Sequence, residues 1–399
     1  LERYERAKAV SEKDPDNETV GAGKWGVVAN GVAFDYASDA VADLGLKDQV
    51  SILKLGMSHP LPEQICIQFL QGKEKVLVVE ELEPINENEL KALAHEKGMA
   101  VTIEGKGTGG FSRLYEYDPG MVRKAVAQYF GVDYSPPEMV DTSDSPQLPG
   151  RPPNLCAGCP HRATYYAVKQ VYGQDAIYPT DIGCYTLGML PPLSMADFVI
   201  CMGSSVSSGC GFSRATDQKV VSFIGDSTFF HSGITGLVNA VHNNHKFTLV
   251  ILDNGTTAMT GHQIHPGVDT TPMGVDRTRI SIENLVRGLG VQDVHVVKPF
   301  KLKKTVEAVK AARDFDGVSV IISEEMCPLF AKATQQFKKS KPFYVNHKKC
   351  KNHRDCINQL ACPAMYLDGE QVEIDKNLCI GCSVCAQVCP ENAIVPVKA

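Results

Sequence analysis

The sequence lacks three features that would place it outside the ordinary globular classes. No uninterrupted apolar run reaches the roughly 18 residues that a transmembrane helix needs. Positive charge is not in excess, because 40 Lys and Arg stand against 46 Asp and Glu for a net charge of −6, which excludes a nucleic-acid-binding polycation. No signal peptide opens the chain, since residues 1–20 are charged and helix-like. We therefore expect a cytoplasmic protein with neither a membrane nor a nucleic acid as a partner.

Cysteine, in contrast, is abundant and unevenly placed. The chain has 14 cysteines, and half of them fall in residues 350–399. A secreted disulfide scaffold is short and rich in cysteine throughout. The observed distribution instead predicts a reducing compartment and a small metal-binding module that is attached to a larger enzyme.

The length of 399 residues predicts two to three domains, at roughly 150 residues each. Apolar strand-like runs at 25–30, 50–55 and 75–81 alternate with helical patterns, and the runs at 220–226, 247–254 and 318–325 do the same, which is typical of α/β domains. A helix is expected over 231–244, with Ile234, Leu237, Val238 and Val241 buried. The expected organisation is a helical lead-in at 1–20, an open α/β domain at 21–135, a linker at 136–153, a second open α/β domain at 154–337 and an iron–sulfur domain at 338–399.

The last cysteines have the spacing of bacterial ferredoxins. Two residues separate Cys379 from Cys382 and Cys382 from Cys385, and three residues separate Cys385 from Cys389, which precedes Pro390. In this pattern the first three thiolates bind one cubane and the fourth binds a neighbouring cluster. Zinc is the main alternative, but zinc sites usually group their cysteines in separated pairs. The motif therefore predicts a [4Fe-4S] cluster.

A partner motif lies upstream and departs from the pattern twice. His353 stands where a cysteine is expected between Cys350 and Cys356, and five residues instead of three precede Cys362. Cross-ligation assigns Cys362 to the cluster of Cys379, Cys382 and Cys385, which leaves Cys350, Cys356 and Cys389 for a second cluster. Either His353 is the fourth ligand, or the second cluster has three irons, or it has been lost. A histidine ligand would raise the reduction potential. One or two clusters are thus expected.

Two strand ends in the second α/β domain predict a magnesium diphosphate site. Asp226 follows Gly225 at the end of one strand, and Asn254 ends the next strand, 28 residues later. Ligands of open α/β sheets bind at the carboxyl ends of the strands. Carboxylate and amide oxygens suit Mg²⁺, which takes its remaining ligands from phosphates and water. This Gly-Asp to Asn spacing is typical of thiamine-diphosphate-binding domains.

Several segments together resemble the alpha subunit of indolepyruvate:ferredoxin oxidoreductase, within the 2-oxo acid:ferredoxin oxidoreductase superfamily. These segments are residues 154–162 (NLCAGCPHR), 181–188 (DIGCYTLG), 225–244 and 252–267, while 54–62 and 78–84 resemble the middle domain of that family. The resemblance implies a transketolase C-terminal-like α/β domain, then a thiamine-diphosphate-binding α/β domain, then a bacterial-ferredoxin-like α+β domain.

The resemblance also implies roles for individual residues. Asp226 and Asn254 would bind Mg²⁺ by side chain and Thr256 by its carbonyl oxygen. His161 and His262 would be the catalytic residues. Cys156 and Cys159 also have the spacing of a zinc or redox pair, although no second pair lies nearby. Thiamine diphosphate would contact Cys156, Cys159, Gly183, Cys184, Gly203, Ser204, Ser205, Gly225, Asp226, Ser227, Asn254, Thr256 and Met259.

The activity that the resemblance implies is the oxidative decarboxylation of arylpyruvates, indolepyruvate foremost, with coenzyme A to arylacetyl-CoA and CO₂. Electrons would pass through the iron–sulfur clusters to external ferredoxin, and a beta subunit would be a further partner. A ferredoxin-linked oxidoreductase of pyruvate, 2-oxoglutarate or branched-chain 2-oxo acids is an alternative. Another is an electron-transfer subunit with a vestigial thiamine domain, and a non-oxidative decarboxylase is disfavoured by the cysteine motif.

One component of thiamine catalysis has no counterpart in the sequence. Thiamine enzymes use a carboxylate beside the aminopyrimidine of the cofactor, and in this family it comes from a pyrimidine-binding domain. The chain begins with Leu instead of Met, and we expect it to be a fragment of a longer protein or to receive this domain from another subunit. We expect residues 1–399 alone to bind thiamine diphosphate weakly and to be inactive.

Overall fold

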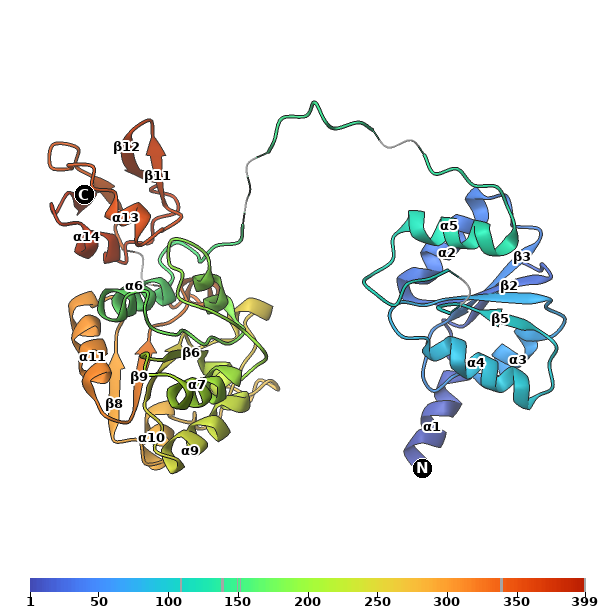
Figure 1. Ribbon diagram of the computed structural model, residues 1–399, viewed down its shortest axis with the longest axis horizontal. Coiled ribbons are helices and arrows are strands. Elements are labelled where there is room, and N and C mark those ends of the chain that lie inside the picture. Colours follow the sequence, from blue (N-terminus) through green and yellow to red (C-terminus); the bar gives the residue numbers. More distant parts are fainter. Residues whose placement is uncertain (108–109, 138–139, 149, 151, 338–339, 398–399) are drawn as a thin grey trace. The chain divides into compact units, whose positions relative to one another are not determined.

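The computed structural model describes residues 1–107, 110–137, 140–148, 150, 152–337 and 340–397. The chain forms two compact units, Leu1–Gln147 and Leu148–Ala399, which are considered separately (Figure 1). Residues 138–139, 149 and 151 of the expected linker lie outside the described residues, as do 338–339 and 398–399 of the expected iron–sulfur domain. No helix among the described residues is both long and apolar enough to cross a bilayer.

The first unit is a five-stranded sheet with helices on both faces (Figure 1). The strand order is β1-β3-β2-β4-β5, and only the edge strand β1 is antiparallel to its neighbour. Helices α2 and α5 share a core with one face, and α3 and α4 with the other. The elements are α1 Glu2–Ser11, β1 Glu18–Val20, β2 Trp25–Asn30, α2 Gly31–Asp43, β3 Val50–Leu55, α3 Glu63–Leu70, β4 Lys75–Val79, α4 Ile85–Glu96, β5 Thr102–Glu104 and α5 Pro119–Phe130.

The apolar runs of this unit explain its two-sided core. Along β4, Leu77 and Val79 face the α2–α5 side, while Val76 and Val78 face the α3–α4 side. A strand that is buried on both faces needs an unbroken apolar sequence, as parallel strands in α/β proteins have. The expectation of a helical lead-in at 1–20 is wrong at its end, because residues 18–20 pair with β3 as an edge strand.

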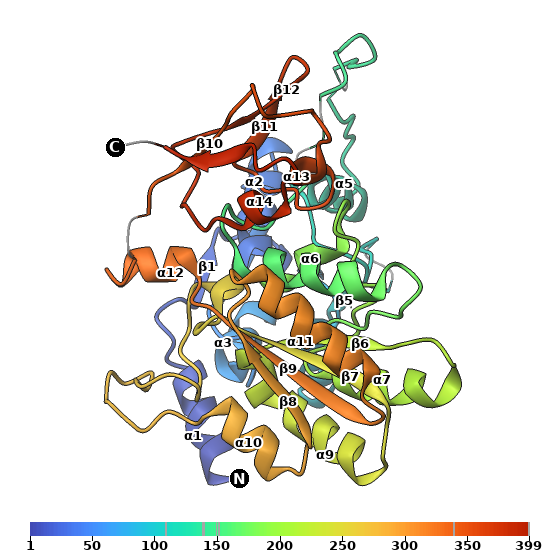
Figure 2. The same ribbon diagram turned by 90° about the vertical axis from the view of Figure 1, so that its left-hand side faces the viewer.

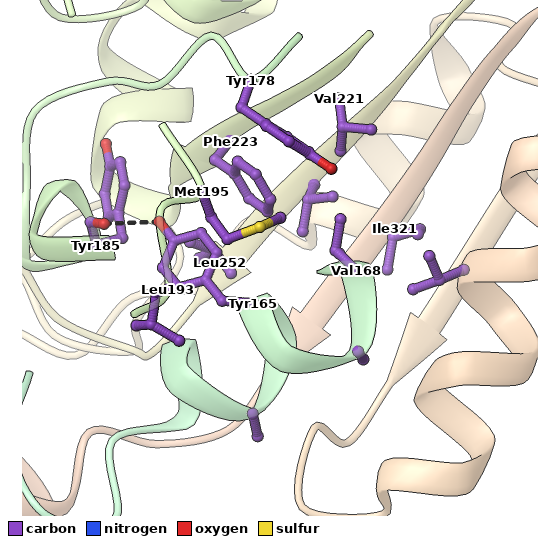
Figure 3. Packing of buried hydrophobic residues seen from close by; sticks show 14 of the residues in the cluster. Tyr165, Val168, Tyr178, Tyr185, Leu193, Met195, Val221, Phe223, Leu252 and Ile321 are labelled. Atoms are coloured by element: carbon purple, nitrogen blue, oxygen red, sulfur yellow. Dashed lines mark hydrogen bonds between the residues drawn. The ribbon is translucent and has the colours of Figure 1, made fainter. Parts of the chain in front are cut away.

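The second unit contains a four-stranded parallel sheet in the order β6-β7-β9-β8. Helices α6 and α11 cover one face, and α7, α9 and α10 cover the other. Figure 3 shows Tyr165 and Val168 of α6 packed against Phe223 and Ile321 from the strands. The elements are α6 Pro160–Tyr172, α7 Ser204–Ala215, β6 Val221–Gly225, β7 Phe247–Asp253, α10 Ile282–Gly288, β8 Asp293–Val297, α11 Leu302–Asp314, β9 Val318–Glu324 and α12 Pro328–Ala333. The α/β class expected for both units is confirmed.

The helix expected over 231–244 differs from the expectation in two ways. It starts earlier, as a short turn α8 Asp226–Thr228, continues as the π-helix η2 Phe229–Gly233 and ends as α9 Ile234–His242. Leu237 is fully buried, but Val238 is 46% exposed. Residue 238 is rotated by about 100° from residue 237 on a helix of 3.6 residues per turn, so the buried stripe does not include it.

The C-terminal part of the second unit is a small α+β domain of the ferredoxin type. Its elements are β10 Phe343–Val345, α13 Asp355–Asn358, β11 Met365–Asp368, β12 Gln371–Ile374, α14 Val384–Val388 and β13 Ile394–Pro396. Strand β10 pairs with β13, and β11 pairs with β12, both antiparallel. Figures 1 and 2 both show α6 between this domain and the parallel sheet. Helix α6 therefore contacts both parts of the unit, and so does the start of α11, where the Leu302 N–H donates to Gln387 Oε1.

Candidate active site and iron–sulfur cavities

The Asp226 carboxylate lies where β6 ends and is held by the chain that leaves β7. Its Oδ2 accepts hydrogen bonds from the backbone N–H of Asn254 (3.0 Å) and Gly255 (2.8 Å). Its Oδ1 accepts from the N–H of Ser227 at 2.7 Å. Strands β6 and β7 are parallel neighbours, so their carboxyl ends meet at one sheet edge. The structure thus brings Asp226 and Asn254 together as the spacing predicted.

A second carboxyl group, that of Asp253, lies beside Asp226 at this edge. Burial and the charge of Asp226 together raise the pKa of Asp253 to about 7. The side chain of His265 is also buried here, with its Nε2 3.2 Å from Asp226 Oδ2. Two neighbouring carboxylates with an amide oxygen beside them form a donor set that fits a divalent cation with oxygen ligands. Asp253 was not predicted as a site residue, although Asp253 directly precedes Asn254.

His161 fixes the orientation of the Asn254 side chain. The Asn254 amide Nδ2 lies 3.2 Å from His161 Nε2, and the Asn254 Oδ1 accepts from the N–H of Thr256 at 3.2 Å. Burial lowers the pKa of His161 to about 4, so the imidazole is neutral near pH 7. A neutral Nε2 that accepts the amide proton leaves the Asn254 oxygen on the other side, toward the loop at Thr256.

These residues line one cleft together with several other predicted contacts. The cleft includes Gly183, Cys184, Gly225, Ser227 and Met259 in addition to His161, Asp226, Asn254 and Thr256. Position 225 requires glycine, because a Cβ there would lie 2.6 Å from the ring of Tyr185. Tyr185 was not predicted, and its ring closes the side of the cleft above Gly225.

Six of the predicted residues do not line this cleft, namely Cys156, Cys159, Gly203, Ser204, Ser205 and His262. Gly203, Ser204 and Ser205 form the start of α7, where the buried carboxylate of Asp181 accepts hydrogen bonds from the Ser205 backbone N–H at 3.2 Å and from its hydroxyl. His262 is stacked on Phe330, with 5.4 Å between ring centroids, and its Nδ1 lies 3.4 Å from Thr256 Oγ1. His262 therefore reaches the site through Thr256.

The cysteines around the cleft are divided between two environments. Cys184 lines the cleft, and burial raises the pKa of its thiol, with smaller contributions from Cys327 and Cys156. Cys327, which had no predicted role, thus lies in the neighbourhood of Cys156 and Cys184. Cys159 lines a different cavity, which belongs to the C-terminal domain. The Cys156–Cys159 turn is therefore shared between the two sites.

Four predicted cluster ligands line that cavity. Cys362, Cys379, Cys382 and Cys385 converge on it, as the cross-ligation rule predicts. The lining also includes Gly158, Cys159 and Arg162 from the start of α6. Within the described part of the chain, no three His, Cys, Asp or Glu side chains converge closely enough to hold a single metal ion. The spacing of these thiols around an open cavity fits a multi-iron cluster.

A second cavity contains the remaining cysteines. Cys350, Cys356 and Cys389 line it together with His353. The His353 Nε2 lies 3.0 Å from Glu391 Oε1, and its side chain is 47% exposed. His353 is thus at the rim of the cavity and paired with a carboxylate, and the identity of the fourth ligand stays a prediction.

Three family models match segments of the chain in the same order as these structural parts. They are the indolepyruvate ferredoxin oxidoreductase middle domain over residues 17–102, the C-terminal TPP binding domain of thiamine pyrophosphate enzymes over 181–323, and a 4Fe-4S binding domain over 372–395. The second model contains Asp226 and Asn254, and the third contains the cysteines 379–389. Thiamine diphosphate and iron–sulfur clusters are therefore the cofactors of the matched domains.

Curated relatives cover nearly the whole chain. The indolepyruvate oxidoreductase subunit IorA of Methanothermobacter thermautotrophicus is 48% identical over 93% of this chain and 59% of its own length. The IorA of Archaeoglobus fulgidus is 41% identical over 100% of this chain and 63% of its own length. A solved 2-oxoglutarate:ferredoxin oxidoreductase from Magnetococcus marinus is 21% identical over 45% of this chain and 66% of its own, with a TM-score of 0.41, a likeness too slight to inform the fold. Over the roughly three fifths of their length that it spans, the chain belongs to the family of the indolepyruvate oxidoreductase subunits IorA.

Proposed function

We propose that the chain binds Mg²⁺ and thiamine diphosphate in the cleft at Asp226 as part of a ferredoxin-linked 2-oxo acid oxidoreductase. The observation that carries the proposal is the convergence of Asp226, Asn254 and Thr256 at the carboxyl ends of β6 and β7. Mg²⁺ would take the Asp226 carboxylate, the Asn254 amide oxygen and the Thr256 carbonyl as ligands. Bound thiamine diphosphate supplies the nucleophilic carbon and the electron sink for decarboxylation.

The residues of the chain have separate tasks in this scheme. Asp226 provides charge for the metal, and His161 holds the Asn254 oxygen available for it through the amide hydrogen bond. Gly225 and Ser227 line the cleft beside the Asp226 carboxylate, where the diphosphate would lie. His161 and His262 are the proposed catalytic residues, and the neutral imidazole of His161 suits contact with a polar substrate or cofactor group. The cavity of Cys362, Cys379, Cys382 and Cys385 would hold the first electron acceptor.

We further propose that the substrate is an arylpyruvate, with indolepyruvate preferred. The balanced reaction consumes one 2-oxo acid, one coenzyme A and two oxidised ferredoxins. It yields one acyl-CoA, one CO₂, one proton and two reduced ferredoxins. The names of the relatives support indolepyruvate, and the word subunit in those names supports a beta subunit as partner. Arylacetyl-CoA is the corresponding product.

The test uses the native complex that contains this chain. We expect thiamine diphosphate and magnesium on analysis, and coenzyme A-dependent dye reduction with indolepyruvate faster than with pyruvate, 2-oxoglutarate or branched-chain 2-oxo acids. Asp226→Asn should abolish thiamine diphosphate binding in calorimetry, whereas Asp217→Asn on the exposed surface should not. A native complex without thiamine diphosphate would instead indicate an electron-transfer subunit with a vestigial thiamine domain.

A further inference from the structure

Arg162 lies at the boundary between the thiamine domain and the first iron–sulfur cavity. It is the third residue of α6, is only 3% exposed, and is one of the residues that line the cavity of Cys362, Cys379, Cys382 and Cys385. The preceding residue, His161, faces the cleft at Asn254 instead. One helical turn thus presents neighbouring side chains to both cavities.

The guanidinium is held in place by main-chain oxygens from both sides. Nη1 donates to the carbonyls of Leu360 (2.8 Å) and Ala361 (2.5 Å) in the C-terminal domain. Nη2 donates to the carbonyl of Leu155 at 2.6 Å. None of these acceptors is a carboxylate, so the charge of Arg162 is not neutralised by its hydrogen bonds. A buried arginine stays protonated, and therefore a fixed positive charge lies beside the cavity.

The Nε–H of Arg162 has no acceptor among the described residues, although the atom is fully buried. Buried donors in folded proteins are almost always satisfied. Burial lowers the pKa of Arg162, and the nearby sulfurs of Cys362, Cys159, Cys156 and Cys382 act in the opposite direction and favour the protonated guanidinium. The missing acceptor is thus best supplied by a sulfur atom of a bound cluster.

We propose that Arg162 is a redox-positioning residue, which donates Nε–H to a sulfur of the cluster in the Cys362, Cys379, Cys382 and Cys385 cavity. The added electron converts the oxidised cluster to its one-electron-reduced form and makes it more negative by one charge. A nearby cation and an N–H···S hydrogen bond stabilise the reduced form more than the oxidised form, which raises the reduction potential. This proposal depends on the iron–sulfur part of the proposed function only.

The proposal also gives the order of the electron path. Because the α6 turn contacts both the thiamine cleft and this cavity, a cluster held by Cys362, Cys379, Cys382 and Cys385 would be the first to accept electrons. The cavity of Cys350, Cys356 and Cys389 shares no lining residue with the thiamine domain and comes second. A higher reduction potential of this first cluster favours electron transfer away from the thiamine site.

The first test compares midpoint potentials by redox titration of the native complex, monitored by EPR. Arg162→Met removes charge and donor, and Arg162→Lys keeps the charge but loses the Nε–H. In Arg162→Met the equilibrium constant for one-electron reduction of the first cluster should fall at least tenfold. This corresponds to a shift of the midpoint potential by about 59 mV to a more negative value. Arg162→Lys should shift it less. The potential of the second cluster should not move in either variant.

Lys169 provides a matched control on the same helix. Its Nζ donates to the carbonyls of Pro192 (2.5 Å) and Leu193 (3.0 Å), and it does not line the cavity. Lys169→Met removes a comparable cation bound to main-chain oxygens and should leave both potentials unchanged. Unchanged potentials in both Arg162 variants, or equal shifts of the two clusters, would overturn the proposal.

A second measurement uses the wild-type protein and therefore does not depend on whether a variant folds. Wild-type complex labelled with ¹⁵N-arginine should show a weak nitrogen coupling to the reduced first cluster in pulsed EPR, and absence of that coupling contradicts the hydrogen bond. Both measurements use chemical reductants and no 2-oxo acid. A failure of the proposed enzymatic activity therefore leaves them interpretable, and a complex without iron would refute the proposed function first.

Discussion

At the scale of the residue, the thiamine cleft depends on one hydrogen bond between side chains 93 positions apart, from Asn254 to His161. The Asn254 amide is 6% exposed and His161 is 3% exposed. A buried donor that loses its acceptor costs its full desolvation penalty. In the proposed site, His161 would therefore control whether the Asn254 oxygen is presented to Mg²⁺.

His161→Leu should weaken the binding of Mg²⁺ and thiamine diphosphate. The Asn254 amide would lose its hydrogen-bond acceptor, and its side chain would rotate. The expected loss of binding free energy is about 1–3 kcal/mol, or roughly 5- to 150-fold in Kd. Isothermal titration calorimetry with thiamine diphosphate and excess Mg²⁺ measures this. His231→Leu, at an exposed histidine, is the control. Wild-type affinity in His161→Leu would show that His161 does not orient Asn254.

The sequence predicts those site residues whose proximity in space follows from their spacing along the chain. Asp226 and Asn254 lie at the ends of two adjacent parallel strands, so their proximity follows from the sequence. Arg162 could not be predicted, because its acceptors at Leu360 and Ala361 are 198 and 199 positions away. Nothing in the local pattern around residue 162 indicates that a distant domain contributes carbonyl oxygens to it.

At the scale of the element, the turn before α6 is shaped by a contact with the ferredoxin-type motif. Gly158 has φ +71°, and a Cβ there would lie 2.1 Å from Ile380 Cδ1. Ile380 stands between Cys379 and Gly381, within the motif that forms the first cavity. The turn can approach the cavity this closely only because residue 158 has no side chain.

Gly158→Ala should separate α6 from the C-terminal domain. A left-handed alanine costs about 1–2 kcal/mol by itself, and the collision with Ile380 adds to this. Gly131→Ala at the end of α5 is the control, because Gly131 has a left-handed backbone (φ +74°, ψ +37°) and no atom within 4 Å of its Cβ position. Thermal unfolding and iron content measure the difference. Equal effects of the two substitutions would mean that the Ile380 contact is unimportant.

Strand positions were the most predictable elements. The runs at 25–30 and 50–55 coincide with β2 and β3, since a two-sided buried strand needs a continuous apolar sequence. The π-helix at Phe229–Gly233 and the edge strand β1 were not predicted. The burial pattern of β1 is exposed throughout, so no alternation of apolar residues marks it. A π-helix differs from an α-helix by one residue per turn, which periodicity over five residues cannot resolve.

At the scale of the whole molecule, the parts differ in what stabilises them. In the described part of the C-terminal domain, the hydrophobic cluster of its own has six buried residues, with six of its cysteines packed around them, while Leu360, Val384 and Val388 pack into the core that contains α6 and α11. The parallel sheets have much larger apolar cores. Small metal-binding domains commonly gain their folding free energy from the metal. The C-terminal domain should therefore depend on its clusters far more than the two α/β parts do.

Removal of iron by a chelator under reducing conditions should increase amide hydrogen exchange in β10, β11, β12 and β13. Exchange in β2, β3 and β4 of the first unit should not change, and these strands serve as the internal control. Mass spectrometry of peptides from the treated and untreated chain measures both. Unchanged protection in the C-terminal strands would show that this domain folds without its clusters.

The described lining of the thiamine cleft contains the carboxylate of Asp226, with Asp253 beside it, and in the proposed function both lie at the magnesium site. Activation of thiamine diphosphate needs another carboxylate beside its aminopyrimidine. The isolated chain of residues 1–399 should therefore show no coenzyme A-dependent oxidation of indolepyruvate, whereas the native complex should. Dye reduction under anaerobic conditions measures this, and turnover by the isolated chain would prove the expectation wrong.

The anchoring of Arg162 on main-chain oxygens also has consequences for sequence divergence. Every amino acid that tolerates the left-handed backbone of Ala361 (φ +50°) offers the same carbonyl, so the side chain at that position can vary within this limit. Position 162 has no such freedom, because only arginine carries three nitrogen donors in one plane. Among related proteins, substitutions should therefore be more frequent at position 361 than at position 162. A ferredoxin-type domain from another protein that is fused at this position would need the same backbone path at Leu360 and Ala361 more than it would need any particular side chain.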